Sequence, residues 1–232
     1  MSPANVAYVI KYNPEVVPNK VMVCPNCVEP RDLSITLLER DEIRNKYGIP
    51  LDKKVFVYGG NLGRPQGIPF LIECLKMQEN NQEAFFLIIG DGTEYGKLDS
   101  YIKESDSTNV KLMKQMMKTD YDRVVAACDV GLIFLDYRFT IPNFPSRLLS
   151  YMQAKIPVLC VTDRNTDIGK IAIEAGFGWM CESNNCNAFD SMIKKLLQLD
   201  LQSAGEKAFE YMHENYSASN SYQIIMHAIQ IK

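Results

Sequence analysis

From residue 53 onward, short apolar runs alternate with longer amphipathic segments, and this alternation limits the folds open to the chain. The runs lie at residues 55–58, 85–89, 110–113, 130–135, 158–161 and 178–181. Strands without polar positions are buried on both faces, and strand–helix alternation leads to parallel pairing. The sequence therefore predicts an α/β fold, a doubly wound, Rossmann-like parallel sheet with right-handed crossovers.

The segments between and around these runs have the apolar spacing of helices. We expect helices at residues 69–78, 94–105, 120–127, 146–154 and 166–175, and three more at 188–199, 204–216 and 219–229. Before the alternating part, Ser2-Pro3 is typical of a helix start and predicts a helix over 4–11. A short strand at 21–23 and a charged helix at 38–47 complete the expected elements.

Composition excludes several functions. The chain has 232 residues and a net charge of −3, and no run of Lys and Arg reaches five, so no nucleic-acid partner is expected. No run of 18 apolar residues and no signal pattern occurs, and seven cysteines fit reduced thiols in the cytoplasm. Cys24-Pro-Asn-Cys27 is a lone CxxC far from His213 and His227, so we expect no metal site.

The loop after the first apolar run has the strongest signal for a ligand. Residues 59–67 hold four glycines in nine positions, together with Arg64 and Gln66. Glycines allow a ligand to approach the backbone, and a helix start and a guanidinium both favour phosphate. The loop therefore predicts an anion site, whereas the alternative is a tight turn with a surface arginine.

The loop after the second run supports a competing hypothesis. Residues 90–96 have a G-x-G-x-x-x-G spacing, similar to that of NAD(P)-binding oxidoreductases. In those proteins the glycines follow the first strand, with an acidic residue about 20 positions later. Here an earlier strand exists and Lys111 stands near that place. A tight turn capped by Asp91 or Thr93 explains this loop equally well.

Two later loops are candidates for the rest of a nucleotide. Met113, Lys114 and Gln115 end the third strand and could frame a flat base, although plain loop packing is nearly as good an explanation. Pro145 and Ser146 open a helix, with Arg147 beside its free N–H groups. Two helix starts converging on one crevice would suit a pyrophosphate, while the alternative is a capped helix with a solvated arginine.

Four motifs in this order resemble one family. They are Gly-Asn-Leu-Gly-x-x-Gln-Gly at 60–67, Ile-Ile-Gly-Asp-Gly at 88–92, Cys-Asp-Val-Gly-Leu-Ile-Phe-Leu at 128–135 and Pro-Ser-Arg-Leu-Leu-Ser-Tyr-Met-Gln-Ala-Lys-Ile-Pro-Val at 145–158. Together they resemble the C-terminal, donor-binding domain of retaining GT-B glycosyltransferases, glycosyl transferase group 1, of the type that builds capsular and O-antigen polysaccharides. The resemblance covers residues 53–232 and implies one half of a GT-B fold. It makes residues 1–30 a hinge and remnant of the N-terminal acceptor domain, and 31–232 the nucleotide-sugar-binding domain.

The resemblance also implies site residues. The phosphate loop would be Gly60, Asn61, Gly63, Arg64 and Gln66, the base loop Met113, Lys114 and Gln115, and the β-phosphate segment Phe144, Pro145, Ser146, Arg147 and Leu148. Arg64 and Arg147 would stabilise charge on the departing diphosphate. The family's glutamate pair falls at Pro142 and Ser150, neither of which is acidic, so Ser150 is a candidate for the ribose.

The implied activity is transfer of a sugar, with retention, from a UDP- or GDP-sugar to a growing polysaccharide or lipid-linked saccharide acceptor. No cofactor or metal is implied, and the expected location is the cytoplasm, at the inner face of the plasma membrane. Because the acceptor site lies in an N-terminal domain or a partner subunit, this chain alone is expected to be inactive. A GT-B-type sugar epimerase, an NAD(P)-binding oxidoreductase domain and a non-catalytic interaction domain are the alternatives.

Overall fold

The computed structural model describes residues 1–105 and 107–230, and its centre is a six-stranded sheet. The strands are β1 (Lys54–Asn61), β2 (Ala84–Asp91), β3 (Val110–Met113), β4 (Val130–Phe134), β5 (Val158–Thr162) and β6 (Gly178–Glu182). All pairs are parallel, in the order β3-β2-β1-β4-β5-β6. Every predicted run in this part is a strand, and the predicted fold class is confirmed.

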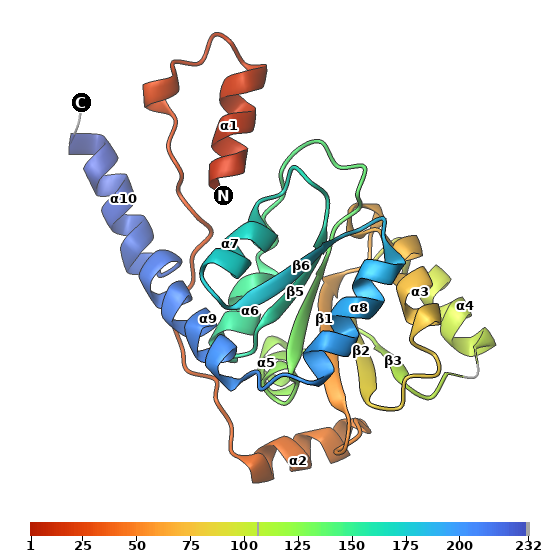
Figure 1. Cartoon of the computed structure of the whole chain (residues 1–232). Helices are drawn as coiled ribbons and strands as arrows, with labels where there is room; N and C mark the ends of the chain where they lie inside the picture. The colour runs from red at the N-terminus through yellow and green to blue at the C-terminus, as the bar shows by residue number, and fades with distance from the viewer. Residues whose placement is uncertain (106, 231–232) are drawn as a thin grey trace.

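Helices cover both faces of the sheet (Figure 1). One face carries α3 (Ile68–Met77), α4 (Tyr95–Glu104) and α8 (Cys186–Leu197). The other carries α5 (Lys118–Ala126), α6 (Arg147–Gln153), α7 (Ile168–Glu174) and α9 (Gln202–Asn215). Alternate residues of β1 enter the two cores, with Val55 and Val57 on the α5–α6 side and Phe56 and Tyr58 on the α3–α8 side.

The N-terminal segment lies outside this sandwich. Helix α1 (Pro3–Tyr12) begins as predicted, with Ser2 at its N-cap and the Asn5 side chain accepting the Ser2 N–H at 2.9 Å. The 3₁₀ turn η1 (Pro18–Lys20) and extended chain follow. The predicted strand at 21–23 is wrong, because that segment has no pairing partner; the nearest pairing is a single parallel bridge between Val28 and Ser217.

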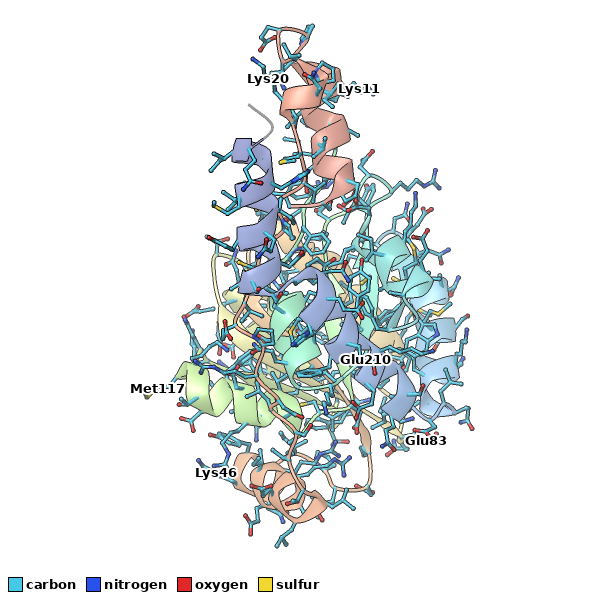
Figure 2. The ribbon with its side chains drawn as sticks, turned by 90° about the vertical axis from the view of Figure 1, so that its left-hand side faces the viewer. Lys11, Lys20, Lys46, Glu83, Met117 and Glu210 are labelled. Atoms are coloured by element: carbon cyan, nitrogen blue, oxygen red, sulfur yellow. The ribbon has the colours of Figure 1, made fainter. Side chains whose placement is uncertain are left out.

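Two helices mark opposite ends of the molecule. Figure 2 shows α1, with Lys11, and the turn that carries Lys20 at one end, and α2 (Leu37–Tyr47), with Lys46, at the other. The last helix, α10 (Ala218–Gln230), projects toward the α1 end in both views. The site therefore has to be sought between these ends, where the strands finish and their loops begin.

Candidate functional site

A cavity of about 780 Å³ lies at the carboxyl ends of β1 and β2, and its size suits a small-molecule ligand. It opens where the sheet order reverses between β1 and β4, the place at which doubly wound folds bind ligands. Its lining comes from the loops after β1, β2 and β3, the starts of α5 and α6, and the extended N-terminal segment. The lining residues are Asn26, Gly59, Gly60, Asn61, Gln66, Ile89, Gly90, Asp91, Gln115, Met116, Lys118, Tyr121, Asn143, Phe144, Pro145, Ser146, Arg147 and Ser150.

The start of α6 supplies an arginine to this cavity. The guanidinium of Arg147 lies over the ring of Tyr58, 4.3 Å from its centroid. Its Nη1 atom is buried and has no hydrogen-bond partner within residues 1–105 and 107–230. In the same described part, no backbone carbonyl accepts the N–H of Ser146 or Arg147. The site thus presents a cation and free amide donors together, as anion binding requires.

Glycines 59 and 60 lie against side chains that reach in from the α5–α6 side, and each is favoured for a different reason. The Tyr121 hydroxyl fills the space that a β-carbon at Gly59 would need. A β-carbon at Gly60 would make an ordinary contact with Nη2 of Arg147 at 3.4 Å, and it is the φ of +121° that favours glycine there. The Gly59 N–H donates to the hydroxyl of the buried Tyr151 at 3.0 Å. These glycines therefore serve packing around the cavity as well as backbone exposure.

The remainder of the first loop forms the 3₁₀ turn η2 (Arg64–Gln66), which separates two residues that we predicted to act together. Gln66 turns inward, where its Oε1 accepts from Asn61 Nδ2 at 3.1 Å and from the Gly63 N–H at 3.2 Å. Arg64 turns outward, with its side chain 89% exposed and its Nε 3.9 Å from Glu94. A one-turn 3₁₀ helix places residues two apart on different sides.

The second and third loops meet at an ion pair. Lys114 Nζ lies 3.3 Å from Asp91 and 3.4 Å from the centroid of the Tyr95 ring. Asp91 also accepts the N–H of Gly92 at 2.8 Å, and the Tyr95 N–H donates to the Gly92 carbonyl at 3.1 Å, which closes a tight turn like the one that we gave as the alternative for this loop. The G-x-G segment follows β2, whereas the NAD(P) pattern follows the first strand of the unit.

The predicted site residues divide into two sets. Those that line the cavity are Gly60, Asn61, Gln66, Gln115, Phe144, Pro145, Ser146, Arg147 and Ser150. Those that lie outside the cavity lining are Gly63, Arg64, Met113, Lys114 and Leu148. Leu148 is fully buried in the core. Of the two helix starts that we expected at the crevice, that of α6 is present, but α5 stands there in place of α3.

Sequence reasoning missed Asn26, Lys118, Tyr121 and the support that Tyr58 gives to Arg147. Asn26 lies 121 positions before the start of α6 and reaches the cavity because the nearby Val28 N–H donates to the carbonyl of Tyr216 at 3.0 Å. No local pattern could have placed it. An aromatic residue directly before two glycines, as at Tyr58, is the one signal that was available.

Electrostatics keep the cavity cationic beside Arg147. Burial lowers the pKa of Arg147, but the neighbouring Tyr58 and Tyr151 raise it above its ordinary value overall. Burial raises the pKa of Tyr121 to about 12 and also raises that of Tyr58, so both phenols stay neutral. Among the described residues, no three His, Cys, Asp or Glu side chains gather to hold a metal ion.

A family model described as glycosyl transferases group 1 matches residues 39–215. The chain belongs to this family. Its curated relatives include the probable glycosyltransferase WbjE of Pseudomonas aeruginosa, 30% identical over 165 residues, or 71% of this chain and 41% of the relative. The putative teichuronic acid biosynthesis glycosyltransferase TuaC of Bacillus subtilis is 24% identical over 57% of this chain and 30% of its own length. This glycosyltransferase family member thus spans less than half of the relatives it matches.

Solved structures agree on the fold. The glycosyltransferase WaaG, involved in lipopolysaccharide biosynthesis, superposes with a TM-score of 0.70 at 17% identity, over 94% of this chain and 59% of that one. Anabaena Alr3699/HepE in complex with UDP-glucose gives a TM-score of 0.79 at 15% identity, over 98% and 61%. Within the described residues, no helix is both long enough and apolar enough to span a membrane.

Proposed function

We propose that the cavity binds the diphosphate of a nucleotide-diphosphate sugar, so that this chain is the donor-binding part of a glycosyltransferase. The observation that carries the proposal is Arg147, a charged guanidinium with an unpartnered Nη1, beside the free N–H groups of Ser146 and Arg147. A diphosphate satisfies all of these donors at once, and burial strengthens the charge-assisted hydrogen bonds. The UDP-glucose of the HepE structure supports the same class of ligand.

The remaining lining residues fit the other parts of such a donor. Gln115 and Met116 lie beyond β3, where we place the base, and Ser150 and Asn143 lie beside α6, where we place the ribose. In the proposed reaction the bond between the anomeric carbon and the diphosphate oxygen breaks, a bond to an acceptor hydroxyl oxygen forms with retention of configuration, and the hydroxyl proton passes to the departing diphosphate. The departing diphosphate takes up negative charge, which Arg147 and the α6 amides would stabilise.

In this proposal the acceptor saccharide binds outside the cavity. Relatives are named for teichuronic acid and colanic acid biosynthesis, which supports a growing polysaccharide or lipid-linked saccharide at the inner membrane face. We propose that an N-terminal acceptor domain or a partner subunit supplies that site, with residues 1–30 as the hinge.

Isothermal titration calorimetry with UDP and GDP tests the donor site directly. Arg147→Met should weaken the preferred nucleotide at least tenfold, because a hydrogen bond to a charged group contributes about 1.5–3 kcal/mol. Arg64→Met should weaken it less than threefold, since its side chain is solvated and outside the lining. Arg138→Met is the matched control, because that exposed arginine pairs with Asp136 and should leave binding unchanged. Absence of binding of either nucleotide at millimolar concentration would overturn the proposal.

A further inference from the structure

Arg147 differs from most of the other arginines in the groups that surround its guanidinium. Five arginines form ion pairs with carboxylates, namely Arg40, Arg44, Arg64, Arg138 and Arg164. Arg147 has no ion pair within the described part of the chain, and its closest charge-complementary group is the π-face of Tyr58. An aromatic face attracts a cation without using any of its N–H donors. The guanidinium is therefore held in place while its buried Nη1 stays free to donate.

The surroundings of Tyr58 fix its ring beside the Arg147 guanidinium. Its side chain is fully buried on the α3–α8 side of the sheet, where the ring packs edge-on against Phe134 at 6.4 Å. Its hydroxyl donates to the carbonyl of Asn61 at 2.7 Å, which ties the ring to the first loop. Packing and this hydrogen bond leave the ring little freedom to turn.

Arg147 comes from the opposite face and reaches Tyr58 across the end of β1. Gly60 lies next to this crossing, where a β-carbon would make an ordinary van der Waals contact with Nη2 at 3.4 Å, and its φ of +121° favours glycine. The order Tyr58-Gly59-Gly60 thus places one aromatic support directly before the glycines beside the guanidinium. Tyr58 of β1 and Arg147 of α6, which are 89 positions apart in the sequence, meet at this contact.

We propose that Tyr58 is a positioning residue for the donor diphosphate, acting through Arg147. The ring fixes the guanidinium against the cavity wall with its donors free, and the hydroxyl fixes the Asn61 end of the first loop. This inference rests on the proposed function, because it names what sets the geometry of that same diphosphate site. Tyr58 itself touches no ligand in this scheme.

A double-mutant cycle on this chain, measured by calorimetry with UDP or GDP, tests the idea. Tyr58→Leu should weaken the nucleotide about tenfold and Tyr58→Phe about threefold, since the first removes ring and hydroxyl and the second only the hydroxyl. In the Arg147→Met background, Tyr58→Leu should weaken the nucleotide only about threefold, because the hydroxyl that holds Asn61 is still lost while the ring no longer has a guanidinium to hold. Phe56→Leu is the matched control, because Phe56 is equally buried two residues earlier on the same face and packs on Phe86.

A second measurement separates positioning from binding. The ring current of Tyr58 should shift the Arg147 Nε–H resonance upfield in the nucleotide-free protein, and Tyr58→Phe should keep this shift while Tyr58→Leu loses it. If the unchanged protein binds neither nucleotide but shows the shift, the donor-site proposal fails and the contact alone stands. If nucleotide binds and Tyr58→Leu behaves like Phe56→Leu, or weakens binding equally without Arg147, the positioning role is overturned.

Discussion

A single residue, Lys155, holds a backbone conformation that its type disfavours. It lies between α6 and β5 with a φ of +52°, in the left-handed region where a β-carbon costs about 1–2 kcal/mol. Its ammonium group lies 3.0 Å from Asp32 and 3.3 Å from Glu206. These ion pairs join the segment before α2 to α9, and they offset part of the strain.

Two substitutions at this position isolate the backbone contribution. Lys155→Ala and Lys155→Gly both lose the ion pairs, but only alanine keeps the strained β-carbon. We expect Lys155→Ala to be less stable than Lys155→Gly by about 1 kcal/mol, as measured by urea unfolding. Equal stability of the two variants would show that the positive φ at residue 155 costs no free energy of unfolding, and that Lys155 acts only through its ion pairs.

At the same scale, the sequence predicted which residue types gather at the site better than where each side chain points. Arg64 directly after Gly63 and Arg147 two positions after Pro145 both stand at a helix start, so we predicted both as phosphate ligands. Their placements differ because a 3₁₀ turn directs Arg64 toward Glu94, whereas Tyr58 draws Arg147 inward. Neither cause is visible from the local sequence, since each depends on a partner at least 30 residues away.

At the scale of elements, a fully buried arginine ties α2 to the sheet. Arg44 is fully buried, and its Nη2 lies 2.7 Å from Asp129, the residue before β4. Asp129 also accepts the N–H of Val55 at 2.6 Å.

Apolar runs predicted every strand of the sheet, but a charged helix such as α2 carries no signal of the surface it packs on. The same absence of a partner signal explains the wrong strand at 21–23.

Removing one member of this pair should loosen the whole element. Asp129→Asn leaves the buried Arg44 without its anion, and we expect a loss of about 3 kcal/mol in the free energy of unfolding. Arg40→Gln is the control, because Arg40 is partly exposed and pairs with the other oxygen of Asp129 at 3.1 Å. That change should cost less than about 1 kcal/mol by urea unfolding. Similar losses from both changes would mean that burial of Arg44 is not what anchors α2.

For the whole molecule, stability should be uneven along the chain. The strands β1 and β4 lie in the middle of the sheet with both faces buried. By contrast, α10, all of which the structure describes, has Ser221 as its one buried residue, and α1 has only Asn5. Helices of this length are marginal in water without an apolar face packed on a core. The two projecting helices should therefore open without unfolding the sheet.

Hydrogen exchange measured at increasing urea concentrations tests this division. Amides of β1 and β4 should exchange only through global unfolding, so their protection should fall steeply with urea. Amides of α10 beyond Ser221 should exchange through local opening that exposes little new surface, and their weaker protection should hardly depend on urea. The exposed Tyr222, Ile225 and Ile229 of α10 leave apolar area for another surface to cover. The contrary result is that α10 is protected as strongly as β1 and that this protection falls when the protein is diluted. Contacts between copies of the chain would then hold the projecting helices, and the uneven stability argued from burial within one chain would be wrong.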